Sequence, residues 1–79
     1  MKNEHKLHLA GYCIGRYEYF GLELSDQSIM NIINLVMNDS QLDEVTDEEY
    51  GIEFMSAYFE LSDIELAECI HLDLVESEN

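Results

Sequence analysis

Basic residues are scarce in this chain of 79 residues, which also contains no proline and no tryptophan. Three lysines and arginines stand against 18 aspartates and glutamates, giving a formal net charge of −15 at pH 7. A chain this acidic is repelled by DNA, RNA and anionic membrane surfaces, because all three are polyanions. The charge therefore excludes electrostatic binding to nucleic acids and to membrane surfaces.

Long hydrophobic runs are missing too, since no apolar stretch approaches the roughly 18–20 residues of a membrane span. The N-terminal residues 1–6 are basic, but His8 and Arg16 interrupt the next segment of the chain, so we expect no signal-peptide core. We therefore expect a cytoplasmic protein. In that compartment Cys13 and Cys69 would remain reduced.

The length allows one domain, and we predict that residues 1–79 form a single acidic domain. Hydrophobic residues make up 47% of the chain, which is too many for a disordered acidic tail. We therefore expect the chain to fold, although like charges on its surface oppose folding.

Residues 6–24 largely alternate between apolar and polar side chains and contain three glycines. Alternation is typical of a strand, and glycines in such a run suggest bulges or turns. We therefore predict a β-hairpin here. The competing prediction is a helix with a face through Leu7, Gly11, Ile14 and Tyr17, in which each glycine would cost about 1 kcal/mol.

Residues 25–38 show a clear helical pattern. Ser25 can cap the N-terminus, and Asp26 lies in the first turn, where the helix dipole favours an anion. The apolar residues that follow at helical spacing are Ile29, Ile32, Ile33, Val36 and Met37. Asn38 is expected to end this helix.

Two capping-box patterns, S/T-x-x-E, predict further helices at Thr46–Glu49 and Ser62–Glu65. The apolar residues that follow the first are Tyr50, Phe54, Ala57, Tyr58 and Leu61, and those around the second are Ile64, Ala67, Ile70 or His71, and Leu74. Residues 70–74 also alternate as a strand would, so we favour a helix that ends before an extended tail. The predicted fold is α+β, with an N-terminal β-hairpin packed on two or three short helices; the alternative is all-α.

No catalytic motif stands out. The chain has neither a G-x-S-x-G nor a phosphate-binding glycine loop, and among 18 carboxylates accidental pairs carry no signal. The small size leaves little room for a deep substrate pocket. We predict that the protein is not an enzyme.

Zinc-ligating residue types occur at both ends of the chain, and they are His5, His8, Cys69 and His71. Their spacing matches no standard zinc pattern. We interpret the two N-terminal histidines as solvent-facing strand residues and the cysteine as a small buried hydrophobe. A calcium-binding EF-hand loop is also absent, because Gln41 occupies the third position of a loop counted from Asp39. We expect no cofactor and no dedicated metal site.

The aromatic residues form an early cluster at residues 12–20 and a later one at residues 50–59. We interpret most of them as core residues, because the chain is small and lacks tryptophan. Some tyrosines would remain exposed as interface anchors, on which an arginine of a partner could stack.

The acidic residues carry the strongest functional signal, because no lysine or arginine follows Arg16. Acids on an ordinary helical surface alternate with bases, which gives each carboxylate a nearby partner. We therefore expect another molecule to supply the missing cations. The predicted partner-binding residues are Asp43, Glu44, Asp47, Glu48, Glu49, Glu53, Glu65, Glu68, Asp73 and Glu76.

In size and charge the chain resembles the small acidic inhibitors that phages and plasmids use against bacterial defence, namely anti-restriction and anti-CRISPR proteins, some of which mimic DNA. The resemblance lies in composition and covers no aligned motif. It implies a stoichiometric inhibitor that blocks a basic surface on a nucleic-acid-binding protein or nuclease. The alternative is an immunity protein or antitoxin that neutralises a cationic nuclease toxin, and a third option is a subunit whose acidic surface serves solubility alone.

Overall fold

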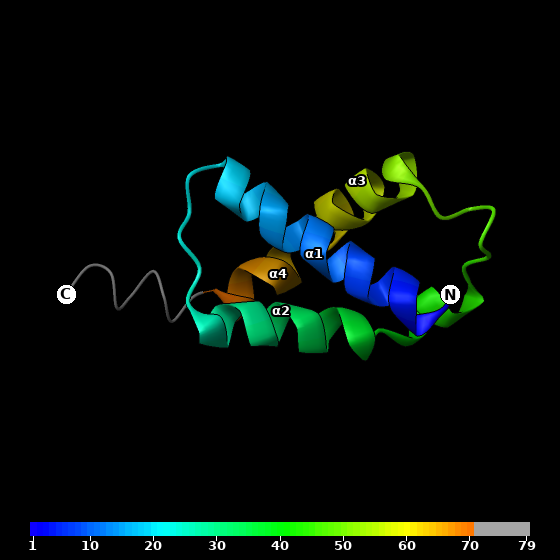
Figure 1. The fold of residues 1–79 in the computed structure, drawn as a ribbon, viewed down its shortest axis with the longest axis horizontal. Coiled ribbons are helices and arrows are strands. Elements are labelled where there is room, and N and C mark those ends of the chain that lie inside the picture. The colour runs from blue at the N-terminus through cyan, green and yellow to red at the C-terminus, as the bar shows by residue number, and fades with distance from the viewer. Residues whose placement is uncertain (71–79) are drawn as a thin grey trace.

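Helices and loops make up all of residues 1–70, which are the residues that the computed structural model describes. Along the chain lie α1 (Asn3–Tyr19), α2 (Asp26–Met37), a short 3-10 helix η1 (Ser40–Glu44), α3 (Ile52–Leu61) and α4 (Asp63–Cys69) (Figure 1). No strand occurs among these residues. The predicted α+β fold is therefore wrong, and the all-α alternative fits. That residues 1–79 form one domain stays a prediction.

A β-hairpin was predicted over residues 6–24, but most of that segment belongs to α1, the longest helix. Its buried residues are Lys6, Leu9, Ala10, Cys13 and Tyr17, which recur every three or four positions and so share one face. The competing prediction of a helix is therefore confirmed, but its predicted face is only partly right, because Tyr17 is buried whereas Gly11 is exposed and Leu7 is 52% exposed. Gly11 and Gly15 lie on the exposed side of the helix, so they lower helix propensity without interrupting the buried face.

Gly21 ends α1, although the sequence pattern suggested a break between strands. Its φ of +89° is a left-handed conformation that glycine adopts without steric cost. The Gly21 amide donates to the carbonyl of Glu18 at 2.9 Å, and the Leu22 amide donates to that of Tyr17 at 3.1 Å. These two bonds form a Schellman motif, which satisfies carbonyls that the end of a helix leaves unpaired.

The prediction of α2 is confirmed. The Ser25 side chain caps the helix, accepting a hydrogen bond from the amide of Ser28 at 3.1 Å. Ile32 and Val36 are completely buried, and the helix ends at Met37 with Asn38 as its C-terminal cap. The polar residue Ser28 is also buried on this face.

Neither of the two predicted capping boxes caps the helix that follows it. The Thr46 hydroxyl accepts from the amide of Glu49 at 3.3 Å and donates to its carboxylate at 3.0 Å. This reciprocal pair closes a turn, whereas α3 begins only at Ile52 with Gly51 as its N-terminal cap. Ser62 makes no side-chain capping bond and is the single residue between α3 and α4. The predicted helix over the Ser62 segment is confirmed as α4, and the predicted extended tail lies outside the described residues.

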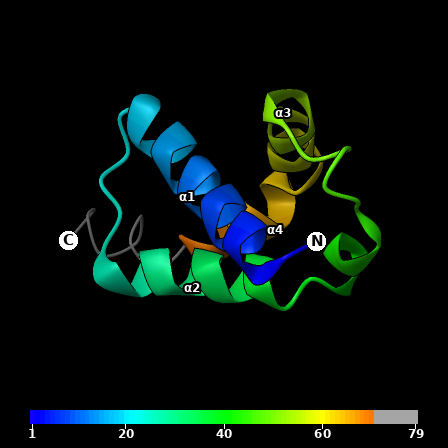
Figure 2. The same cartoon turned by 45° about the vertical axis from the view of Figure 1, so that its right-hand side comes forward.

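The helices enclose one hydrophobic core. α1 and α2 run in opposite directions and pack against each other, while α3 packs against α1 at a distance from α2 (Figures 1 and 2). α4 packs against both α2 and α3. The core consists of Leu9, Ala10, Cys13, Tyr17, Ile32, Val36, Leu42, Met55, Phe59, Leu66 and Ile70.

A helix that crosses a membrane must be both long and apolar. Within residues 1–70, none of the helices combines the length and the apolar composition that crossing a bilayer requires. The cytoplasmic location stays a prediction.

Candidate functional site

The predicted partner-binding residues occupy two regions of the fold. Six of them lie between η1 and the first turn of α3: Asp43, Glu44, Asp47, Glu48, Glu49 and Glu53. Glu65 and Glu68 lie on α4. Asp73 and Glu76 are outside the described residues. All eight described residues are solvent-exposed, so each carboxylate can reach a partner unless another group of the chain holds it.

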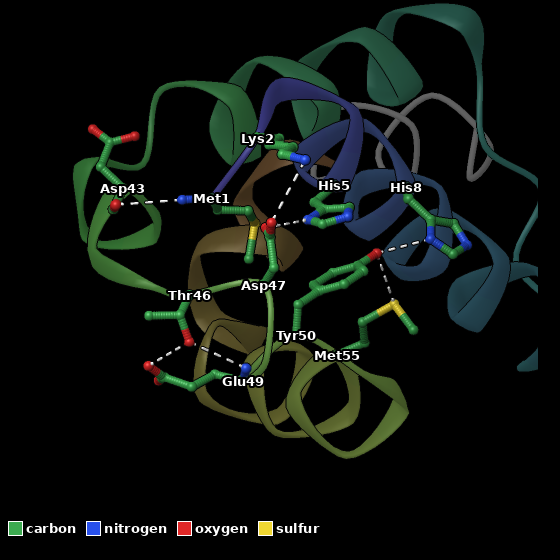
Figure 3. Close-up of polar contacts among 10 residues, drawn as sticks. All are labelled: Met1, Lys2, His5, His8, Asp43, Thr46, Asp47, Glu49, Tyr50 and Met55. Atoms are coloured by element: carbon green, nitrogen blue, oxygen red, sulfur yellow. Dashed lines mark hydrogen bonds and ion pairs between the residues drawn. The ribbon is translucent and has the colours of Figure 1, made fainter.

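Asp43 is held by the N-terminus of the same chain. Its Oδ1 lies 2.6 Å from the Nζ of Lys6, a residue whose side chain is buried on α1. The hydrogen bond from Lys6, together with its positive charge, lowers the pKa of Asp43 below its ordinary value of 3.8. The N-terminal ammonium of Met1 also donates to the Asp43 carbonyl at 3.3 Å (Figure 3). Asp43 therefore fastens η1 to α1 and is not a free binding group.

Asp47 is held in the same way. One of its oxygens lies 3.6 Å from the Lys2 ammonium, and the other lies 3.3 Å from the Nδ1 of His5 (Figure 3). The second approach is at ion-pair distance but lacks the geometry of a hydrogen bond. Sequence reasoning missed both partners because they are more than 40 positions away from Asp47 along the chain.

Tyr50 completes this attachment. The imidazole of His5 stacks on its ring, with centroids 4.3 Å apart and planes 10° apart. The Tyr50 hydroxyl lies 2.8 Å from the Nδ1 of His8 (Figure 3). Both histidines therefore lie on α1 and contact Tyr50, so their prediction as strand residues is wrong, while His8 is exposed to solvent as predicted and His5 is partly buried.

Arg16, the remaining basic side chain, faces aromatic rings. The carbon at the centre of its guanidinium lies 4.9 Å from the ring centroid of Phe20, 5.5 Å from that of Tyr19 and 5.8 Å from that of Phe59. Such contacts are cation–π interactions. Among residues 1–70 no ion pair involves Arg16, so it neutralises no neighbouring carboxylate.

Six of the eight described binding residues have no cationic partner within residues 1–70. Five of the six also make no side-chain hydrogen bond there, and they are Glu44, Glu48, Glu53, Glu65 and Glu68. We call them the open carboxylates. Glu49 takes part in the Thr46 turn, and Asp43 and Asp47 are paired as described above. Sequence reasoning therefore found the acidic surface but overestimated the number of uncompensated groups on it.

The potential zinc ligands do not gather. No group of three or more histidines, cysteines and acidic residues suited to a metal ion occurs within residues 1–70. Cys69 instead donates its thiol to the Glu65 carbonyl at 3.4 Å. Burial, and then the charges of Glu68 and Glu65, raise the pKa of this thiol. His71 lies outside the described residues.

Most aromatic residues belong to the core. Tyr17 and Phe59 are buried and meet edge to face, with ring centroids 5.3 Å apart. Four others are partly buried against the core, and they are Tyr12, Tyr50, Phe54 and Tyr58. Tyr19 and Phe20 are exposed, to 78% and 57%. The arginine that stacks on these two rings is Arg16 of the same chain.

Two features of this surface escaped the sequence analysis. Leu61 and Ile64, which were assigned to the core faces of their helices, are 86% and 74% exposed. A groove of about 600 Å³ between α2 and α4 is lined by polar side chains, among them Asn34, Asn38 and Glu65. The helical spacing of Leu61 and Ile64 signals an apolar stripe, but it does not say whether the stripe faces the core.

Comparisons with known proteins do not define the site. No protein-family model matches the chain, and neither a curated protein nor a solved structure matches it. Fold, charge and exposed side chains are therefore the basis for proposing a function.

Proposed function

We propose that the protein is a small acidic inhibitor that binds a basic, nucleic-acid-binding surface of another protein in a stoichiometric complex. The observation that carries the proposal is the set of open carboxylates. Two of the three basic side chains are used by Asp43 and Asp47, and the third faces aromatic rings. No cation of the described chain is left for Glu44, Glu48, Glu53, Glu65 or Glu68.

A basic partner would gain from these groups in two ways. Lysine and arginine side chains form charge-assisted hydrogen bonds with carboxylates, and arginine forms them in pairs. A net charge of −15 would also draw a cationic partner in and raise the association rate at low salt. The complex should therefore form quickly and weaken as ionic strength rises.

DNA mimicry is one form that this inhibition would take. Glu65 and Glu68 are three positions apart on α4, so their carboxylates lie on one side of the helix. Carboxylates on successive helical turns recur at about 5.4 Å, within the range of phosphate separations along a nucleic acid. A groove that binds phosphates would then accept these carboxylates instead.

The alternative is an immunity protein or antitoxin bound to a cationic nuclease toxin. The exposure of Tyr19 and Phe20 favours it, because aromatic side chains are frequent anchors of a compact, tight interface. A DNA mimic would depend mainly on carboxylates spread along an extended face. Absence of catalytic activity stays a prediction in both cases.

Capture of partners on the immobilised protein, followed by competition, tests the proposal. A lysate of the source organism or its host is applied at low salt, and the bound proteins are identified. We expect basic nucleic-acid-binding proteins that elute at high salt and that duplex DNA of any sequence displaces. Tight binding to one nuclease, unaffected by added duplex, favours the immunity alternative.

Matched pairs of substitutions show whether specific carboxylates matter. E65Q/E68Q and E48Q/E53Q each neutralise two open carboxylates, whereas E4Q/E18Q neutralises two exposed glutamates of α1. We expect the first two variants to weaken partner binding more than the third does. Equal losses in all three would indicate a general field effect, and no salt-sensitive binding to any basic protein would leave solubility as the role of the charge.

A further inference from the structure

The segment formed by α3 and α4 carries two apolar stripes. One is buried and consists of Met55, Phe59, Leu66 and Ile70. The other faces solvent and consists of Ala57, Leu61, Ile64 and Ala67, spaced four, three and three positions apart. Spacing of four positions places Ala57 and Leu61 on one side of α3, and spacing of three places Ile64 and Ala67 on one side of α4; Ser62 is the single residue between these two helices.

The exposed stripe is not needed by the core of the described residues. Leu61 and Ile64 are 86% and 74% exposed and thus the most exposed of the large aliphatic side chains in residues 1–70. α3 packs against α1 at a distance from α2, and its outer side is open to a partner (Figures 1 and 2). Exposed aliphatic residues at helical spacing are typical of a face that receives another helix.

Acidic residues surround this stripe and restrict what can cover it. Glu68 follows Ile64 by four positions on α4 and so lies beside it, while Glu60 and Glu65 are exposed and adjoin Leu61 and Ile64 in the sequence. A second copy would bring the same carboxylates against one another, with a charge of −15 on each chain. Anionic lipid would be repelled likewise. A partner that carries both apolar and basic side chains fits the stripe.

The polar groove lies beside the same corner. Ser62, Glu65 and Cys69 line one side of it from the joint and α4, and Asn34 and Asn38 line the other from α2. Glu65 is thus both a neighbour of the exposed stripe and a wall of the groove. A guanidinium beside Leu61 would find the Glu65 carboxylate and amide oxygens as acceptors there.

From these observations we infer that the α3–α4 corner docks a cationic amphipathic helix of the partner protein. Leu61 and Ile64 receive the apolar side of that helix, while Glu60, Glu65 and Glu68 receive its lysines and arginines. The inference rests on the proposed function, since it names the part of the acidic surface that makes contact and the kind of element that binds there.

Binding of two labelled peptides tests the inference directly on the full-length protein. The first probe is a 14-residue peptide of leucine and lysine arranged with helical periodicity, and the second has the same composition in an order without an apolar face. Fluorescence anisotropy at low salt measures both affinities. We expect tighter binding of the amphipathic probe, because only that peptide presents apolar and basic sides together.

Substitution of the stripe supplies the decisive comparison. L61S/I64S should weaken binding of the amphipathic probe about tenfold, which is about 1.4 kcal/mol, because two aliphatic contacts are lost. The control L7S/I52S removes two exposed aliphatic residues elsewhere and should leave the affinity unchanged. All four residues are exposed, so we expect the variants to stay folded, and circular dichroism verifies this.

The remaining outcomes separate this inference from the proposed function. Equal binding of both peptides, sensitive to salt but not to L61S/I64S, overturns the inference and leaves the acidic-inhibitor proposal standing. No salt-sensitive binding of either peptide overturns the inference and counts against the proposal as well. Sedimentation measures the oligomeric state of both proteins. A wild type that is a dimer and an L61S/I64S variant that is a monomer would assign the stripe to a second copy and also overturn the inference.

Discussion

Substitution of Gly11 and Gly15 by alanine would test the helical structure of the N-terminal segment. Both glycines lie inside α1 on its exposed side. A Cβ atom built at either position meets nothing within 4 Å, so alanine fits without displacing a neighbour. The only expected effect is therefore the difference in backbone and helix propensity between glycine and alanine.

The expected gain follows from that difference. Alanine in a helix interior is more favourable than glycine by about 0.5–1 kcal/mol, partly because the unfolded chain loses freedom. G11A/G15A should therefore raise the free energy of unfolding by about 1–2 kcal/mol. For a domain of this size each kcal/mol raises the Tm by about 4–8 °C.

Thermal unfolding followed by far-ultraviolet circular dichroism measures the effect, and G21A is the matched control. Gly21 has a φ of +89°, so alanine there is strained and should lower the Tm although its Cβ also meets nothing. A lower Tm for G11A/G15A would refute the reasoning. In a β-hairpin with glycines at bulges, these substitutions would destabilise.

Three further expectations concern the core, the Lys6 contact and a thiol. L66A should cost about 2–5 kcal/mol because Leu66 is fully buried, whereas I64A should change stability by less than about 0.5 kcal/mol, as chemical denaturation would show. Lys6 lowers the pKa of Asp43 in the folded state. Their contact therefore stabilises the folded protein above pH 3.8 and is lost as the pH falls through the lowered pKa. The Tm difference between wild type and D43N should shrink as the pH falls through the same values. Burial raises the pKa of Cys13 to about 12, so its thiol should react with iodoacetamide only after unfolding, and rapid reaction of this residue in the native protein would contradict its buried position.

Local capping chemistry decided which helices the sequence could predict. α2 has a serine cap, an acidic first turn and an apolar face with a clear period, and these signals agree with one another. The Thr46 box made its predicted hydrogen bonds but closed a turn, because two residues of a capping box satisfy each other whether or not a helix follows. Local hydrogen bonding is thus readable from sequence, while the element that it begins is not.

The N-terminal segment was misassigned because two patterns overlap in it. Leu7 and Leu9 alternate as in a strand, yet only Leu9 is buried, and it belongs to a helical face with Cys13 and Tyr17. Gly21 fits both a break between strands and a helix C-terminus. Burial of that face against α2 and α3 offsets the poor helix propensity of the interior glycines, and this tertiary contribution is not visible in the local sequence.

The acidic surface was predictable as a composition and not as a set of free groups. The absence of lysine and arginine after Arg16 correctly indicated a shortage of neutralising cations. Only the fold brings Lys2 and Lys6 to Asp47 and Asp43, because those contacts join distant parts of the chain. The exposed stripe with Leu61 and Ile64 was recognised as apolar but assigned to the wrong side, since periodicity cannot distinguish a core face from a docking face.

The central claim is tested most directly by measuring how the affinity for a captured basic partner depends on salt. The measurement compares the wild type with a variant in which all five open carboxylates are replaced by glutamine. The wild type should bind with an affinity that falls steeply as salt rises, and the variant should bind at least tenfold more weakly at low salt, with a shallower dependence. Undiminished affinity of the neutral variant would contradict the claim that a cationic partner completes this surface.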